Sequence, residues 1–309
     1  MASASLVRST DRRNSVTTGP LGYTITAEIG RGVFGVVFRG VDPRGNDCAM
    51  KHVHLTSPVV RAEIAMLSQL HPHPNLVRVL EVSEDHKKPD FVWYVIDFCT
   101  GPTLNDYILS SVPKIDVSLK LKLILDVANA LQYLHSKNLL HRNLKPDNIF
   151  VSGFEGGEGI VTRCKVADFG LAHIWEANTT LPTSYYTKTS HSFGPPFYTA
   201  PEVRELKIVT DKCDIYSLGM LLLGSILETT AQCLWAVEKE MLVPIINDQD
   251  IEEATPLQIQ KAMEDKGVRN TQLIQIVIHM LSVDHERRPN IFEVCSPLLD
   301  ALFAHFNSR

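Results

Sequence analysis

The hydrophobic pattern of this chain of 309 residues changes its period once, close to Gly101. Before that point apolar residues alternate or run in short blocks, which indicates β-strands. The predicted strands are 23–30, 35–42, 46–55, 75–84 and 91–99, the last two as a buried pair, and one short helix is predicted over 61–70. After Gly101 the spacing becomes helical, so a β-rich part precedes a larger helical part.

The helical part contains one long amphipathic pattern over 118–138. Its predicted buried face carries Leu121, Ile124, Leu125, Ala128, Leu131 and Leu134. Further helices are predicted over 213–228, 271–282 and 291–306, and short strands within 148–167 flank a Gly- and Glu-rich segment, 152–163, expected to be an exposed hairpin insert. The predicted fold class is therefore α+β and bilobal. A small β-rich lobe covers 23–98, a larger α-helical lobe covers 101–306, and the polar residues 1–22 are a disordered lead.

Net charge and composition limit which binding partners and which cellular compartment we expect for the chain. The net charge of −5 gives no reason to expect a surface for nucleic acid or membrane lipid. The longest apolar stretch, 218–227, is too short to span a bilayer, so no membrane insertion is expected. The six cysteines form no CxxC pair, which favours a reducing, intracellular compartment, cytoplasmic or nuclear.

A glycine-rich stretch, "GRGVFGVV", places Gly30, Gly32 and Gly35 in the pattern G-x-G-x-x-G. Alone, this pattern fits a dinucleotide-binding turn, a phosphate-covering loop between two strands, or chance. A dinucleotide turn needs a helix that begins at the last glycine. Val36 and Val37 are β-branched and favour a strand instead, so we expect a loop whose backbone amides cover phosphates.

Lys51 and Glu63 follow on the next predicted strand and helix. An ion pair between them would direct the lysine ammonium at the α- and β-phosphates. Most lysines on strands simply face solvent. The short connection between the two residues makes Glu63 the weaker candidate of the pair.

Two later motifs carry oxygen ligands for a metal ion. "HRNLKPDN" (141–148) supplies Asn148 and "ADFG" (167–170) supplies Asp168, and such hard oxygen ligands suit Mg²⁺. Lys145 can neutralise charge on a transferring phosphate. Two further acidic residues are expected to be structural. Glu202 of "APE" is a partner for Arg288, and Asp214 is expected as the N-cap of an apolar helix.

Taken in order, these motifs resemble the eukaryotic protein kinase superfamily, Ser/Thr type, over residues 23–306. "YVIDFCTG", "KVADFGLAHIW" and the preceding insert are similar to the group of PDZ-LIM-protein-interacting kinases. The resemblance implies ATP and Mg²⁺ as cofactors and a protein as substrate or partner. The ATP-binding residues that it implies are Gly30, Arg31, Gly32, Gly35, Val37, Ala49, Lys51, Asp97 and Cys99. It further implies Ile96 as gatekeeper, Asp97–Cys99 as hinge, and a regulatory spine of Leu67, Leu80, His141 and Phe169.

Two residues depart from the family pattern. Asn143 stands where the family has an aspartate that accepts the proton of the substrate hydroxyl, and a neutral amide cannot act as a base near pH 7. Pro195 stands where Ser/Thr members carry a threonine bonded to that aspartate. We therefore expect a weakened or inactive kinase homologue that still binds ATP. The alternatives are a slow but active kinase, since phosphoryl transfer rests largely on positioning and electrostatics, and a nucleotide-free structural domain.

The segment from Asp168 to Glu202 is rich in hydroxyl residues. One interpretation is a mobile polar loop. The other is a regulatory segment in which phosphate on Thr187, Thr189 or Ser190 pairs with Arg142.

Overall fold

The computed structural model describes residues 17–32, 35–55, 64, 70–110, 115–156, 159–168, 173–174, 198–204, 209–228, 232–236, 241–246, 249–250 and 254–307. The chain forms two compact units. The first unit comprises Met1–Ser57 and Val79–Phe98, and the second comprises Pro58–Arg78 and Cys99–Arg309. The last crossing between the units therefore falls at 98–99, inside the segment expected to be a hinge.

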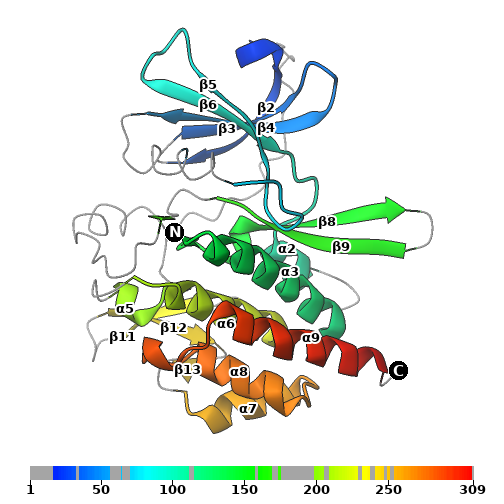
Figure 1. Cartoon of the computed structure of the whole chain (residues 1–309), viewed down its shortest axis with the longest axis vertical. Coiled ribbons are helices and arrows are strands. Elements are labelled where there is room, and N and C mark those ends of the chain that lie inside the picture. Colours follow the sequence, from blue (N-terminus) through cyan, green and yellow to red (C-terminus); the bar gives the residue numbers. More distant parts are fainter. Residues whose placement is uncertain are drawn as a thin grey trace. The chain divides into compact units, whose positions relative to one another are not determined.

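The first unit is built on an antiparallel sheet of six strands in the order β1-β2-β3-β4-β6-β5 (Figure 1). Its elements are β1 (Thr17–Thr18), the 3-10 turn η1 (Pro20–Gly22), β2 (Thr24–Gly32), β3 (Gly35–Val41), β4 (Asp47–His54), β5 (Val79–Glu84) and β6 (Phe91–Asp97). The alternating sequence pattern thus predicted these central strands correctly. Of the helix predicted over 61–70, only Ile64 is described, and it is helical.

One face of this sheet holds an apolar core. Tyr23, Cys48, Met50 and Val95 are buried together, and the partly buried Ile25, Phe38 and Trp93 pack against them. Because successive side chains of a strand point to opposite faces, Ala49 and Lys51 of β4 point to the other face from Cys48 and Met50. The apolar core therefore fixes which face of the sheet the lysine occupies.

Two predictions for this unit were wrong at their edges. β5 covers only Val79–Glu84 of the predicted strand, and it is not buried, since Leu80 is 36% and Val82 42% exposed. The reason is that β5 is the last strand of the sheet, so alternate side chains face solvent. In addition, Thr17 and Thr18 pair with β2, so regular structure begins before residue 23. Residues 1–16 lie outside the described part.

The second unit is mostly helical. Its helices are α2 (Leu104–Ser110), α3 (Val117–Ser136), α5 (Pro201–Arg204), α6 (Lys212–Leu227), α7 (Pro256–Asp265), α8 (Thr271–Met280) and α9 (Ile291–Asn307), with 3-10 turns η2 (Pro146–Asn148) and η4 (His285–Arg287). Its strands are β7 (Leu139–Leu140), β8 (Ile149–Gly156), β9 (Gly159–Val166), β10 (His173–Ile174), β11 (Gln232–Ala236), β12 (Met241–Ile246) and β13 (Gln249–Asp250).

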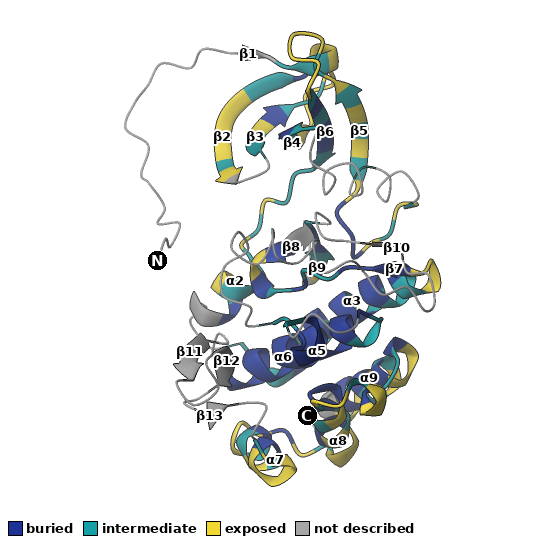
Figure 2. Cartoon of the chain, turned by 90° about the vertical axis from the view of Figure 1, so that its left-hand side faces the viewer, coloured by how far each residue is buried: buried dark blue, intermediate teal, exposed yellow. Residues whose placement is uncertain are grey.

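Helices α3 and α6 form the centre of this unit, and Figure 2 shows them as mainly buried, whereas α7 has a largely exposed side. Every residue of α6 from Cys213 to Leu227 is buried, because the helix is apolar all round. The four long predicted helices correspond to α3, α6, α8 and α9. Helix α7 and the three-stranded sheet β11-β12-β13 were not predicted from the sequence pattern. Among the described helices, none is both long and apolar enough to cross a bilayer.

The predicted hairpin insert is confirmed as a strand pair. β8 and β9 pair antiparallel from Ile149↔Val166 to Gly156↔Gly159. Most of its side chains lie outside the described part, so their exposure stays a prediction.

Residues 70–78 belong to the second unit, although the sequence analysis placed them in the β-rich lobe. The Asn75 Nδ2 donates to the Cys164 carbonyl at 3.1 Å, and Leu76 forms a parallel bridge with Val166. The backbone N–H of His71 donates to the Tyr133 hydroxyl at 2.9 Å. These long-range hydrogen bonds attach the segment to β9 and α3.

Candidate active site

The glycine-rich stretch forms the turn end of the β2–β3 hairpin. Gly30 lies opposite Val37 and Gly32 lies opposite Gly35. The strand β3 begins at Gly35, where a dinucleotide-binding turn would begin a helix. The strand predicted after the last glycine is confirmed, and the dinucleotide interpretation is thereby excluded, whereas a role of the backbone amides at phosphates stays a prediction.

Lys51 shares one face of the sheet with the glycine hairpin. The register places Gly30, Val37, Lys51 and Tyr94 in one row across four strands, and residues in such a row face the same side. The Lys51 Nζ lies 5.2 Å from the centre of the Tyr94 ring. Ala49, two positions earlier on β4, shares this face. The strand register thus gathers four predicted ATP-site residues on one side.

Arg31, also predicted to bind ATP, lies differently. It is opposite Val36 in the hairpin, so its side chain points to the other face from Val37. Its guanidinium is exposed and pairs with both carboxylate oxygens of Glu28, at 2.9 and 2.8 Å. A contact of Arg31 with phosphate would therefore come from its backbone N–H.

The two outer glycines of the hairpin should respond differently to substitution. A Cβ at Gly35 would lie 2.1 Å from the His52 carbonyl oxygen and 2.9 Å from the Val53 Cα, whereas a Cβ at Gly30 would meet only the Val37 Cβ, at 3.9 Å. We expect Gly35→Ala to push β3 away from β4 and to destabilise the first unit by about 1–3 kcal/mol.

Gly30→Ala is the matched control and should change stability by less than about 0.5 kcal/mol. Hydrogen exchange of the β3 and β4 amides measures the loss of protection in each of the two variants. Equal protection in the two variants would contradict the steric argument.

In the second unit, the buried carboxylate of Asp214 holds the loop that contains Asn143. The backbone N–H groups of His141 and Arg142 donate to its two oxygens, each at 2.8 Å. The His135 Nε2 lies 3.0 Å from Oδ2. Asp214 therefore has the structural role that the sequence predicted. The predicted N-cap position was wrong, because α6 begins at Lys212 and Asp211 precedes it.

The contacts of His141 define its tautomer. The backbone N–H of Asn143 approaches Nδ1 at 3.3 Å, so Nδ1 accepts. Nε2 lies 3.2 Å from the Ala167 carbonyl, which can only accept, so Nε2 carries the proton. Neutral His141 thus connects the loop to the end of β9.

Burial acts on both ionisable groups of this region. Burial lowers the pKa of His141 below its usual value, and the negative charges of Asp214 and Asp168 oppose this without reversing it. For Asp214, burial alone would raise the pKa, but the hydrogen bond from His135 and that from the Arg142 N–H lower it. Near pH 7, Asp214 is therefore a carboxylate and His141 a neutral imidazole.

The lowered pKa of His141 predicts a pH dependence of stability. The unfolded chain takes up a proton near pH 6.5, while the folded protein does so only at lower pH. The contribution of neutral His141 to the free energy of unfolding is therefore fully present above about pH 6.5. It decreases as the pH falls below that value, by at most about 1.4 kcal/mol per pH unit. Urea unfolding between pH 7.5 and 5 measures this slope.

His141→Phe should remove one proton from that slope. His52 and His73, whose pKa values burial also lowers, contribute with the same sign and remain in the variant. A slope unchanged by the substitution would show that His141 does not titrate as argued.

Asn143, Asn148 and Asp168 meet directly. The Asn143 Nδ2 donates to the Asp168 Oδ2 at 2.9 Å, and the Asn148 Nδ2 donates to the Asn143 carbonyl at 2.8 Å. Both acceptors are acceptor-only groups, so chemistry fixes the orientation of each side-chain amide. Asp168 has φ 63°, in the left-handed region, as does Arg142. The predicted metal ligands and the residue at the base position thus form one cluster.

The oxygen atoms of this cluster fit Mg²⁺. Because the nitrogen of the Asn148 amide is directed at a carbonyl, its Oδ1 is the atom that can coordinate a cation. Asp168 adds a carboxylate. Mg²⁺ is usually held by one or two protein oxygens together with phosphates and waters, so this donor set suits a nucleotide-bound Mg²⁺.

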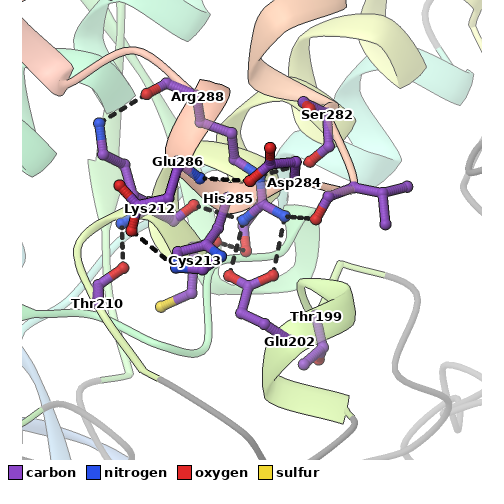
Figure 3. A network of polar contacts seen from close by, with 12 residues as sticks. Thr199, Glu202, Thr210, Lys212, Cys213, Ser282, Asp284, His285, Glu286 and Arg288 are labelled. Atoms are coloured by element: carbon purple, nitrogen blue, oxygen red, sulfur yellow. Dashed lines mark hydrogen bonds and ion pairs between the residues drawn. The ribbon is translucent and has the colours of Figure 1, made fainter.

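A second polar network confirms the predicted Glu202–Arg288 pair (Figure 3). Arg288 Nη1 and Nη2 donate to the two Glu202 oxygens at 2.7 and 2.8 Å. The same guanidinium donates to the carbonyls of Ser282, Lys212 and Val283, at 2.8, 3.1 and 3.4 Å. This network joins α5, the start of α6 and the segment at η4.

The remaining predicted residues are placed only in part. Asp97 ends β6, Cys99 is the first residue after the crossing between the units, and the Lys145 carbonyl accepts from Asn148 N–H at 3.0 Å. The predictions for Glu63, Leu67, Phe169, Thr187, Thr189, Ser190 and Pro195 lie outside the described residues. His135 was missed, because only its distant contact with Asp214 gives it a role.

Comparisons with known proteins agree with this arrangement. A model of the protein kinase domain matches residues 23–298. A probable myosin light chain kinase of Dictyostelium discoideum is 28% identical over 281 residues, which cover 89% of this chain and 80% of that protein. A second probable myosin light chain kinase of that organism is 31% identical over 208 residues, 64% of this chain and 48% of that protein. A putative serine/threonine-protein kinase/receptor of Acanthamoeba polyphaga mimivirus is 32% identical over 205 residues, 63% of this chain but only 11% of that protein.

The chain belongs to the protein kinase domain family, and Ser/Thr protein kinases are among its relatives. The predicted superfamily is thereby confirmed. The narrower resemblance to PDZ-LIM-protein-interacting kinases stays a prediction.

Proposed function

We propose that this protein is an ATP-binding Ser/Thr kinase homologue with weakened or absent phosphotransfer, which acts as a scaffold or allosteric partner of another protein. The observation that carries the proposal is the contact between Asn143 and Asp168. The side-chain nitrogen of Asn143, at 2.9 Å, is directed at a carboxylate oxygen. A side-chain amide in this position can orient a hydroxyl but cannot take its proton near pH 7.

The residues of a nucleotide site are present on the chain. In the first unit, the glycine hairpin, Val37, Ala49 and Lys51 share a face that can receive the adenine and phosphates. In the second unit, Asn148 and Asp168 would hold Mg²⁺, and Lys145 would neutralise phosphate charge. Bound Mg²⁺ would screen the β- and γ-phosphates. The scattered cysteines, which form no CxxC pair, support an intracellular place of action, in cytoplasm or nucleus.

A slow but active Ser/Thr kinase is the second candidate. It is favoured by the order of the loop itself, since Asp214, His141 and Asn148 all hold the loop by hydrogen bonds. Positioning and electrostatics supply most of the catalysis in phosphoryl transfer. A loop held in this way could therefore support slow transfer without a base.

Restoring the missing carboxylate should separate the two candidates. We expect Asn143→Asp to raise the rate of transfer from radiolabelled ATP to a generic protein substrate or to the protein itself by about 10²-fold, the low end for a general base. The gain should be larger when Pro195→Thr is added, because the threonine hydroxyl can bond the new carboxylate. The native chain with Asp168→Asn sets the background.

Turnover of the native protein at ordinary kinase rates of about 1–100 s⁻¹, unchanged by either reversion, would overturn the inactive interpretation. Nucleotide binding is tested independently of transfer. ATP–Mg²⁺ at a hundred times its Kd should stabilise the protein by about 2.7 kcal/mol, and no stabilisation at saturation would favour a nucleotide-free structural domain.

A further inference from the structure

The position of Asn143 is fixed from both sides of its backbone. Its N–H donates to His141 Nδ1 at 3.3 Å and its carbonyl accepts from Asn148 Nδ2 at 2.8 Å. His141 is itself fully buried and bonded to the carbonyl of Ala167. Ala167 N–H in turn donates to the Asn148 carbonyl at 2.8 Å. The loop and the end of β9 are therefore joined by hydrogen bonds that leave little freedom to the backbone next to Asp168.

On this backbone, the Asn143 side chain donates directly to Asp168 Oδ2, at 2.9 Å. Asp168 also has a left-handed backbone with φ 63°, which is costly for a residue other than glycine unless local hydrogen bonds compensate. A hydrogen bond from a neutral amide stabilises the ionised carboxylate without introducing a second charge. The described structure thus contains a group of its own that holds Asp168 in place.

A carboxylate at position 143 would reverse this effect. The same geometry would bring two anionic oxygens to hydrogen-bond distance, and like charges at that distance repel strongly unless a cation or a proton lies between them. Aspartates at positions 143 and 168 would therefore depend on a nearby cation, such as the one that Asn148 and Asp168 would hold, to keep this geometry. The site with Asn143 is organised by a hydrogen bond.

We propose that Asn143 is a positioning residue that replaces part of the divalent cation's role at Asp168, so that this site is ordered, and nucleotide binds, with little dependence on Mg²⁺. The nucleotide half of this inference rests on the proposed function. The half that concerns Asp168 does not, because it follows from contacts within the second unit alone.

The melting temperature of the protein without nucleotide tests the part of the proposal that concerns the ordering of Asp168. In EDTA, Asn143→Asp should lower the melting temperature by several degrees, and millimolar Mg²⁺ or Mn²⁺ should restore a large part of the loss. The native protein should shift by less than about 1 °C between the two conditions. Asn138→Asp adds the same charge at an exposed position of the same unit and should show no rescue by the cation.

A third variant keeps the test informative if Asn143→Asp fails to fold. Asn143→Leu removes the donor without adding charge, so it should be less stable than the native protein, and the cation should restore a smaller loss than in Asn143→Asp because no like-charge repulsion has to be neutralised. Absence of cation rescue in a folded Asn143→Asp, or an Asn143→Leu variant as stable as the native protein, would overturn the proposal.

Nucleotide affinity tests the part of the proposal that concerns the weak dependence of nucleotide binding on Mg²⁺. Titration with a fluorescent ADP analogue in EDTA and in Mg²⁺ should give Kd values within about 10-fold of each other for the native protein. Asn143→Asp should widen this ratio by at least a further 10-fold. The Asp168→Asn change, added to Asn143→Asp, removes the opposing carboxylate. The ratio of the Kd in EDTA to the Kd in Mg²⁺ should then become smaller again.

The outcomes distinguish the two proposals. If the native protein binds the analogue with a strong Mg²⁺ requirement equal to that of Asn143→Asp, the nucleotide half of the inference fails and the proposed ATP binding stands. If no variant binds the analogue under either condition, both the proposed function and the nucleotide half of the inference fail.

Discussion

Replacing Arg288 by alanine is expected to destabilise the second unit by about 3–5 kcal/mol, because the change leaves a buried carboxylate without its cation. The Arg288 side chain has 0% and Glu202 has 7% of its surface exposed, and the pair is bidentate. The substitution removes more interactions than this ion pair. Three carbonyl oxygens, of Ser282, Lys212 and Val283, also lose a donor.

The matched changes at Glu202 should cost less. In Glu202→Ala the guanidinium keeps its three carbonyl acceptors and its position 4.9 Å over the Tyr216 ring. The combined variant Glu202→Leu with Arg288→Met removes both charges, and such apolar replacements are often close to neutral. Here the three carbonyls still lose the hydrogen bonds from the guanidinium, so we expect the double variant to lie between Arg288→Ala and the native protein.

Urea unfolding followed by far-UV circular dichroism measures this order of stabilities. A double variant as stable as the native protein would show that the carbonyl hydrogen bonds contribute little. Arg288→Ala with a loss below about 1 kcal/mol would contradict the assignment of a buried ion pair that joins three segments.

The sequence predicted those helices and strands that a pattern of neighbouring residues indicates. Alternating residues gave the strands around Lys51, and a helical stripe gave α3, because each pattern is produced by burial of one face. The glycine hairpin was predicted from two β-branched residues after Gly35, which favour a strand over a helix at that place. The helix α7 had a local signal too, since Thr255 and Gln258 form an N-terminal capping box and Pro256 is the first helical residue. It was overlooked because its apolar stripe is short.

What the sequence could not predict are the roles that depend on distant contacts. Asp214 was expected as an N-cap because aspartate is common there, yet its partners lie between 72 and 79 positions away in the chain. The direction of Asn143 toward Asp168 likewise depends on the folding of the segment that separates them, because the two residues are 25 positions apart in the chain. Arg31 was grouped with the glycines by its motif, and only the register between β2 and β3 separates it from them.

Substituting Asp214 by asparagine is expected to cost about 3 kcal/mol or more, although the two side chains have nearly the same shape. The carboxylate accepts three hydrogen bonds, two on Oδ2 and one on Oδ1. Asparagine has a single acceptor oxygen. Whichever way its amide is turned, an NH₂ group faces at least one buried N–H donor, and the hydrogen bonds to a charged acceptor are lost.

The same substitution at Asp211 is the control, because Asp211 precedes α6 and makes no side-chain capping hydrogen bond. Asp211→Asn should change the stability by less than about 0.5 kcal/mol. The two variants remove the same charge from the same end of the same helix, so the burial of Asp214 and its contacts distinguish them.

The loop that contains Asn143 should report the difference most directly. Arg142 has φ 63°, and its N–H bond to Asp214 is one of the contacts that compensate for that backbone conformation. In Asp214→Asn we expect hydrogen exchange at the His141 and Arg142 amides to accelerate well beyond the change in global stability, while the β8 and β9 amides follow the global value. Uniform acceleration across the second unit would mean that Asp214 stabilises the unit as a whole and does not specifically hold the loop.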